Sequence, residues 1–314
     1  MYYVKKVAAM IATVLLVTLL SFLAFSVIPG DAARLALGTE ATDEQVEALR
    51  EKMGLNENVF VRYGKWVAGA VKGDLGDSSY YKQPVSELMG DKLKVTLILS
   101  LLSLVIIIAV SVPVSVLMSL HEGRATERVL TAVGRVLMAV PSFLTGIILI
   151  YIFVYNMQLY DRFRFIDYET DPAAFAGFII LPAVALAIPK IAMVTNFLHA
   201  NLIKEMNKDY TRTLRTMGKS RGYIIWVHAL KNAMLPTVTF LGIVATEVLA
   251  GSVIIEQVYT IPGLGRLMVQ AIGHRDYNVT QAIVLYIAVI VVTVNFVVDL
   301  LYRVLDPSVK RGDA

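Results

Sequence analysis

The sequence predicts an all-α membrane protein with six transmembrane helices. Of its 314 residues, 57% are apolar, more than the roughly half that soluble domains carry, and the mean hydropathy is +0.65. The charged residues gather in short islands between long apolar runs, which is a polytopic layout. These runs do not alternate with a period of two residues, so a transmembrane β-barrel is excluded.

Each predicted span is close to the ~20 apolar residues that cross a bilayer. The first, at 7–28, follows Lys5 and Lys6 and exceeds the ~7–15 residues of a signal-peptide core, so we predict an uncleaved helix ended by Pro29 and Gly30. The other spans are predicted at 95–119, 136–157, 174–199, 237–255 and 280–302. Prolines inside them predict kinks that neighbouring helices accommodate; these are Pro113, Pro141, Pro182 and Pro189.

The distribution of lysine and arginine predicts the orientation. With the N-terminus inside, the short outer loops hold only Arg162, Arg164, Arg266 and Arg275, and the inner segments hold most of the others. We therefore expect both termini in the cytoplasm. The predicted organisation is a first transmembrane helix within 1–30, an external helical segment at 31–94, a five-helix core at 95–303 and a cytoplasmic tail at 304–314.

The external segment is predicted to contain two helices. Thr42 stands three residues before Gln45, the spacing of a capping box, and Gly54 is expected to close the helix that starts there. A second helix is predicted at 58–71, followed by a turn at 73–76. Two interpretations stay open: a small cap on the outer membrane surface, or a docking surface for an extracellular partner.

The most informative stretch is the cytoplasmic segment 204–236 between the fourth and fifth spans. It holds seven lysines or arginines but only Glu205 and Asp209 as acids. A helix is predicted at 210–217, and Gly218 permits a sharp reversal before an apolar face resumes and Pro236 opens the fifth span. A basic segment bound to anionic membrane lipid is the alternative interpretation.

This segment resembles the cytoplasmic coupling loop of binding-protein-dependent ABC importer permeases, closest to the oligopeptide, dipeptide and nickel branch. The stretches that carry the resemblance are Tyr210-Thr-Arg-Thr-Leu-Arg-Thr-Met-Gly218 and His228-Ala-Leu-Lys-Asn-Ala-Met-Leu-Pro236. Further stretches agree in order and spacing: Gly73-Asp-Leu-Gly76, Pro84-Val-Ser-Glu87, Ala139-Val-Pro-Ser-Phe143, Val253-Ile-Ile-Glu256, Pro262-Gly-Leu-Gly-Arg266, Arg275-Asp-Tyr277, Asp299-Leu-Leu-Tyr302 and Asp306-Pro307. The resemblance covers almost the whole chain and is to the first of the two permeases in such systems.

The resemblance implies a type I importer fold in a prokaryotic cytoplasmic membrane. It also implies partners: a second homologous permease, one or two cytosolic ATPases that bind ATP and Mg²⁺, and an external solute-binding protein. The loop would dock on an ATPase as a short coupling helix. The residues expected to take part in ATPase coupling are Tyr210, Arg212, Arg215, Met217, Gly218 and Lys219.

Three ionisable residues fall within or at the edge of predicted spans. Lys190 lies deep in the fourth, Glu247 lies near the middle of the fifth, and Asp299 lies toward the inner end of the sixth. Because a central charge costs ~2.5–3.5 kcal/mol on insertion scales, such residues usually face a cavity or a partner. We hypothesise that Lys190 and Glu247 line the translocation path; a structural ion pair is the alternative. For Asp299 a structural role is expected.

Several chemistries are excluded or not expected. There is no cysteine, so disulfides and thiolate sites are excluded, and the four histidines show no metal-ligand spacing. The sequence lacks a Gly-x-x-x-x-Gly-Lys-Ser/Thr phosphate loop, so we expect no ATP hydrolysis by this chain, no cofactor in it and no enzymatic activity. No nucleic-acid partner is expected.

The expected function is that of a permease subunit that forms half of a path for peptides. The same architecture importing nickel or another small solute remains an alternative. A stand-alone secondary transporter is a third, although repeated halves and discontinuous helices, which are typical of that class, are not visible in the sequence.

Overall fold

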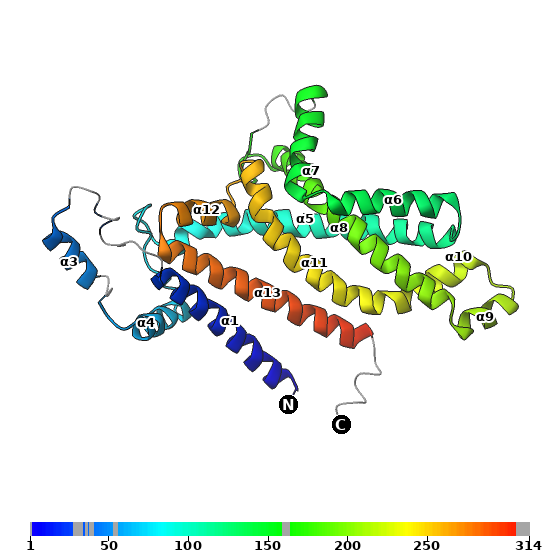
Figure 1. Ribbon diagram of the computed structural model, residues 1–314, viewed down its shortest axis with the longest axis horizontal. Helices are drawn as coiled ribbons and strands as arrows, with labels where there is room; N and C mark the ends of the chain where they lie inside the picture. The colour runs from blue at the N-terminus through cyan, green and yellow to red at the C-terminus, as the bar shows by residue number, and fades with distance from the viewer. Residues whose placement is uncertain are drawn as a thin grey trace. The chain divides into compact units, whose positions relative to one another are not determined.

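Long apolar helices dominate the computed structural model of the protein (Figure 1). The structure describes residues 2–27, 34, 37, 41–52, 56–158 and 164–305. By length and composition five helical stretches can cross a membrane, and a sixth if one bent pair counts as a span. The helices that form these five are α1 (Tyr2–Val27), α5 (Val85–Leu120), α8 (Pro172–Met206), α11 (Leu230–Val258) and α13 (Tyr277–Leu305). The predicted class, an all-α membrane protein, is confirmed.

Shorter helices connect the spans. They are α3 (Asp43–Lys52), α4 (Val59–Val71), α6 (Ala125–Ala139), α7 (Ser142–Leu149), α9 (Asp209–Thr216), α10 (Arg221–Tyr223) and α12 (Leu264–Gly273), with π-helical turns η1 (Ile150–Asn156) and η2 (Ile224–Ala229). The sequence did not predict α12, whose buried positions Leu264, Leu267 and Ala271 recur at helical spacing.

The span predicted as one helix at 136–157 is broken instead. α6 ends at Ala139, α7 begins at Ser142, and the two helices are bent by 100°. Val140 is extended, at φ −85° and ψ 119°, because the residue before a proline is pushed out of the α-helical region. The prediction of a continuous helix here is wrong: Pro141 separates two helices rather than kinking one.

Other prolines stay inside their helices. Pro113 lies within α5, Pro182 and Pro189 lie within α8, and Pro236 lies within α11. The prediction that Pro236 opens the fifth span is therefore wrong, since one helical stretch runs from Arg221 to Val258. The turns before Pro236 stay helical because they bury an apolar face. The free energy gained from this burial exceeds the cost of the backbone hydrogen bond that the proline removes. This face consists of Ile224, Ile225, Ala229 and Ala233.

The chain divides into two compact units. The first comprises Met1–Val95 and Pro262–Thr293, and the second comprises Thr96–Ile261 and Val294–Ala314. The helices α5 and α13 each contribute residues to both units.

In the first unit, the predicted helix starts are observed. The Thr42 amide donates to the Gln45 Oε1 atom at 3.0 Å, and the Gln45 amide approaches the Thr42 hydroxyl at 3.4 Å, so the capping box precedes α3. The Asn58 side chain caps α4 by accepting from the Phe60 amide at 2.9 Å. Gly54, predicted to close the first of these helices, lies outside the described residues.

Several of the short motifs meet around one buried carboxylate in the first unit. Asp276, with no exposed surface, accepts from the Ser78 hydroxyl and from the Tyr80 amide. The Asn278 side chain donates to the Asp77 carbonyl oxygen at 2.9 Å. Segments almost 200 residues apart in the sequence are thus tied together, and their apolar side chains form one core cluster. That cluster consists of Leu75, Val85, Leu88, Met89, Leu264, Leu267, Ala271, Val279, Ala282 and Ile283.

This core also explains why α5 starts at Val85 rather than at the predicted 95. Residues 85–94 include charged side chains, which are rare within a membrane span. Even so, Val85, Leu88 and Met89 are buried at helical spacing. The helix therefore extends beyond the apolar run by which the sequence defined the span.

Candidate functional site

The candidate coupling segment, residues 207–220, lies in the second unit between the end of α8 and the start of α10 (Figure 1). Its helix α9 is fixed to α8 by Thr211, which is fully buried and whose hydroxyl donates to the Met206 carbonyl oxygen at 2.7 Å. Gly218 then takes φ +81°, a left-handed conformation. The Lys219 amide donates to the Leu214 carbonyl oxygen at 3.1 Å, which closes the end of the helix. The predicted helix and glycine reversal are confirmed, with α9 one residue earlier at each end.

A polar cluster, which we call the Glu205 clamp, joins α8, α9 and α11. It comprises Glu205, Lys208, Tyr210 and Asn232. The Tyr210 hydroxyl donates to Glu205 Oε2 at 3.0 Å, and the Asn232 amide nitrogen lies 3.4 Å from the same oxygen and 3.3 Å from the Tyr210 hydroxyl. Lys208 Nζ pairs with Glu205 Oε1 at 2.6 Å. Only 8% of Glu205 is exposed, so this carboxylate is a fixed internal acceptor rather than a surface charge.

The protonation of Tyr210 suits this arrangement. Burial raises the pKa of the phenol above its usual value; the hydrogen bond with Asn232 opposes this effect, and the hydrogen bond to Glu205 adds to it. Tyr210 therefore remains a donor at physiological pH, and its hydroxyl points into the protein.

The predicted coupling residues divide into two sets. Facing inward are Tyr210 and, in part, Arg215, whose guanidinium donates to the Met206 carbonyl oxygen at 3.3 Å. Arg212 has a side chain 73% exposed, and Met217 is 67% exposed. Lys219 places its ammonium 5.0 Å from the centre of the Tyr223 ring. The outward set offers a cationic and apolar surface.

Beneath α9 lies an apolar core that connects the coupling segment to the spans. The fully or nearly buried members of this core are Val116, Leu198, Leu202, Met206, Ile224, Ile225, Ala229 and Ala233. Leu214 of α9 packs against it. At its edge His199 bonds Ser119 at 2.9 Å and Glu127 at 3.0 Å, and Arg221 pairs with Glu122. These contacts link α5, α6, α8 and α10.

The helices α8 and α11 pack antiparallel in one constant register. Lys190 pairs with Glu247, Phe197 stacks on Phe240 at 4.1 Å between ring centres, and Glu205 bonds Asn232. Lys190 and Glu205 are fifteen residues apart on α8, and Asn232 and Glu247 are fifteen apart on α11, so the register does not slip between these pairs. The ion pair and the clamp are therefore about 22 Å apart along the same two helices.

The predicted path residues are thus neighbours. The Lys190 side chain is 22% exposed and that of Glu247 is 39% exposed. Asp299, the third charge noted in the sequence, is partly buried on α13. The structure therefore brings Lys190 and Glu247 together, and the sequence left that pairing open.

Sequence reasoning missed Glu205 and Asn232 as members of the site. A signal was present for the first, since Glu205 is one of two acids in a strongly basic segment. For Asn232 the sequence contained no such signal. Its role depends on the packing register of α8 on α11, and the amino-acid sequence alone does not specify that register.

The structure is that of a multi-pass membrane protein with an exposed cationic face on its short helix α9. Comparison with known proteins defines the class further. A family described as "Binding-protein-dependent transport system inner membrane component" matches residues 111–311, and the corresponding N-terminal family matches residues 1–101. The chain belongs to this family of importer permeases, as the sequence resemblance predicted.

Individual relatives match over almost their whole length. A probable peptide ABC transporter permease of Sinorhizobium fredii is 32% identical over 98% of this chain and 99% of its own. The oligopeptide transport system permease AppB of Bacillus subtilis is 33% identical over 98% and 99%. A glutathione transport system permease of Escherichia coli, GsiC, is 30% identical over 98% of each chain. The protein is an integral inner-membrane permease subunit of an ABC importer.

Proposed function

We propose that this permease forms half of a peptide path and couples it to separate cytosolic ATPases through α9. The observation that carries the proposal is the division of α9 into two faces. Tyr210 and Thr211 anchor it inward, while Arg212 and Met217 remain exposed. A helix held in this way transmits a push as a rigid body.

The exposed face suits an ATPase groove. Arg212 can pair with acids on the partner, and the unbranched Met217 side chain can fill an apolar pocket. The inward residues Tyr210 and Arg215 act as positioning residues in this proposal. ATP and Mg²⁺ would be bound by the ATPases, and this chain would hydrolyse no ATP.

Peptide as the substrate is supported by two observations. The relatives named above are described as permeases for peptides, oligopeptides or glutathione. The Lys190–Glu247 pair also presents both signs of charge within the spans, and these match the two termini of a zwitterionic peptide. Nickel or another small solute is the alternative substrate, and a stand-alone carrier is the alternative class.

The complete transporter in this proposal contains a second homologous permease and an external solute-binding protein. A six-helix subunit encloses only half of a path, so a second permease supplies the other half. Both termini lie in the cytoplasm, which places α9 on the ATPase side of the membrane.

Affinity purification of the tagged chain from membranes, followed by mass spectrometry, tests the assembly. We expect a sister permease and an ATPase to be recovered, and the ATPase to be lost when Gly218 and Arg215 are substituted together. Recovery of the chain alone, in every mild detergent, would support the stand-alone carrier.

Uptake by cells that lack the gene tests the substrate. We expect loss of labelled dipeptide or oligopeptide uptake with unchanged nickel uptake. Loss of nickel uptake alone would replace the peptide assignment and leave the coupling mechanism standing.

A further inference from the structure

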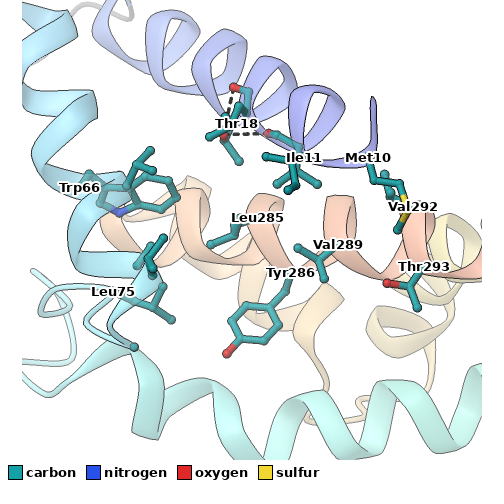
Figure 2. Close-up of a pocket in the computed structure, with 16 residues that line it drawn as sticks. Met10, Ile11, Thr18, Trp66, Leu75, Leu285, Tyr286, Val289, Val292 and Thr293 are labelled. Atoms are coloured by element: carbon teal, nitrogen blue, oxygen red, sulfur yellow. Dashed lines mark hydrogen bonds between the residues drawn. The ribbon is translucent and has the colours of Figure 1, made fainter. Parts of the chain in front are cut away.

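A pocket lies in the first unit. This pocket of about 500 Å³ opens between α1, α4 and α13 (Figure 2). Ile11 and Val14 line it from α1, Trp66 and Val67 from α4, and Leu285 and Val289 from α13. Such a volume is within the range of small-molecule sites.

The side chains that line the pocket favour an apolar ligand. None of the described residues that line the pocket is charged. The polar Thr18 in its wall already bonds within the protein, through its hydroxyl to the Val14 carbonyl oxygen at 2.8 Å and to the Tyr63 hydroxyl at 2.8 Å. The wall also contains the polar groups of Tyr286, Thr293 and Trp66, whose indole nitrogen is buried without a hydrogen-bond partner among the described residues. Most of the lining is apolar, so the cavity gives water few hydrogen-bond partners.

The pocket lies beside helices that are long and apolar enough to cross a bilayer. Two of its walls, α1 and α13, are candidate membrane spans. The third, α4, was predicted to lie outside the membrane, yet the Tyr63 hydroxyl donates to the carbonyl oxygen of Leu15 at 2.8 Å. Leu15 is the midpoint of the span Val4–Ser26. The helix α4 therefore packs beside the middle of α1 and closes the pocket on one side.

The pocket runs along the middle of the first candidate span. Its lining runs from Met10 to Thr18 on α1 and from Leu285 to Thr293 on α13. Eight residues of helix span about 12 Å, and on α1 this stretch extends to both sides of Leu15, the midpoint of the span. One extended hydrocarbon chain can lie along both helices.

We propose that the pocket walled by α1, α4 and α13 binds one acyl chain of a membrane phospholipid. This site is independent of the peptide path and of ATPase coupling. The lipid fills the space between α1 and α13 and makes α4 part of the membrane-embedded structure.

Photolabelling of the assembled transporter in nanodiscs tests the proposal. The probe is phosphatidylethanolamine with a diazirine on one acyl chain, and labelled peptides are mapped by mass spectrometry. We expect labels on α4 and on the pocket faces of α1 and α13. The variants Val14→Trp and Val289→Phe fill the pocket from opposite walls, and each should reduce this labelling at least fivefold.

Leu16→Trp is the matched control, because Leu16 is 57% exposed on the same helix and does not line the pocket. Labelling should be unchanged in this variant, and recovery of the sister permease should be equal in all three. Equal labelling of wild type, filled and control variants would show ordinary surrounding lipid and overturn the proposal. Recovery of the same pocket residues crosslinked to the sister permease instead of lipid would also overturn it.

Discussion

The helix α8 makes two polar contacts with the helical stretch that contains α11. The two contacts fit the same packing register of the helices, but they differ in position, composition and burial. The Glu205 clamp lies at the end of the helices, contains two ionised groups and two neutral ones, and fixes a segment outside the spans. The Lys190–Glu247 pair lies about 22 Å further along and consists of two opposite charges inside the spans.

The differences in burial and charge indicate which role each contact can have. At the clamp a largely buried carboxylate accepts from two neutral donors and pairs with one lysine, so the contact stabilises one geometry and suits a rigid connection. At the ion pair both partners retain exposed surface and pair with each other, which is compatible with the proposed exchange of either partner for a charged ligand. A constant register between the two makes α8 and α11 one body that connects the coupling end to the centre of the membrane.

The largest expected effect comes from breaking the ion pair. Lys190→Met leaves the Glu247 carboxylate unpaired within the spans, at a cost of about 2.5–3.5 kcal/mol. We expect a lower unfolding temperature in detergent and loss of peptide transport. The double variant Lys190→Met, Glu247→Met removes both charges and should recover the stability but not the transport. Wild-type transport by the double variant would make the pair purely structural.

The next effect separates coupling from assembly at the clamp. Glu205→Ala leaves the partly buried donors of Tyr210 and Asn232 without this acceptor, which costs about 1 kcal/mol. In the reconstituted transporter we expect the ATPase to remain bound while substrate no longer stimulates ATP hydrolysis. Asp209→Ala is the control, because its carboxylate lies four residues further along the chain, at the start of α9, and is 97% exposed. Equal loss of stimulation in both variants would contradict a positioning role for Glu205.

A comparable effect tests the reversal at Gly218. An added Cβ would meet no atom within 4 Å, so only the backbone conformation at φ +81° opposes a larger residue. Gly218→Val should therefore cost about 1–2 kcal/mol and reduce ATPase recovery, whereas Gly218→Asn should retain most of it, because asparagine tolerates this conformation. Measurement of the ATPase-to-permease ratio after purification decides the point. Equal ratios for the two variants would show that the conformation is not required.

The smallest change in stability is expected at the exposed face of α9. Arg212→Ala and Met217→Ala should alter the free energy of unfolding by less than about 0.5 kcal/mol, since both side chains are largely exposed. Both should weaken ATPase binding, measured by titration of the purified ATPase. Lys231→Ala, which removes an exposed charge from α11, should not. Unchanged affinity in both α9 variants would move the docking surface elsewhere.

Much of the fold followed from local patterns. Apolar run length located the long spans, Thr42 and Gln45 marked the start of α3, and Gly218 marked the reversal after α9. The errors came where tertiary packing opposes a local rule. Pro236 signals a helix start, but buried Ile224 and Ile225 extend the helix before it. Pro141 signals a kink, but the backbone there breaks completely.

The site was predicted less completely than the fold. Tyr210 was assigned to the ATPase interface by its place in a motif, and the structure directs its hydroxyl toward Glu205. The helix α4 was assigned to the outside because it follows a span, and its contact with Leu15 places it beside the middle of α1. In both cases the direction of a side chain decided the role, and sequence spacing does not specify that direction.

By itself, the sequence determined that this protein has several helices long and apolar enough to cross a membrane, and that the basic loop with Gly218 is the distinguishing feature. Those properties depend on composition and local backbone preference, which act over a few residues. Tertiary structure decided that Lys190 meets Glu247, that Glu205 holds Tyr210 and Asn232, and that α4 closes a pocket. Those contacts depend on the register of helices far apart in the chain, and many side chains fix that register together.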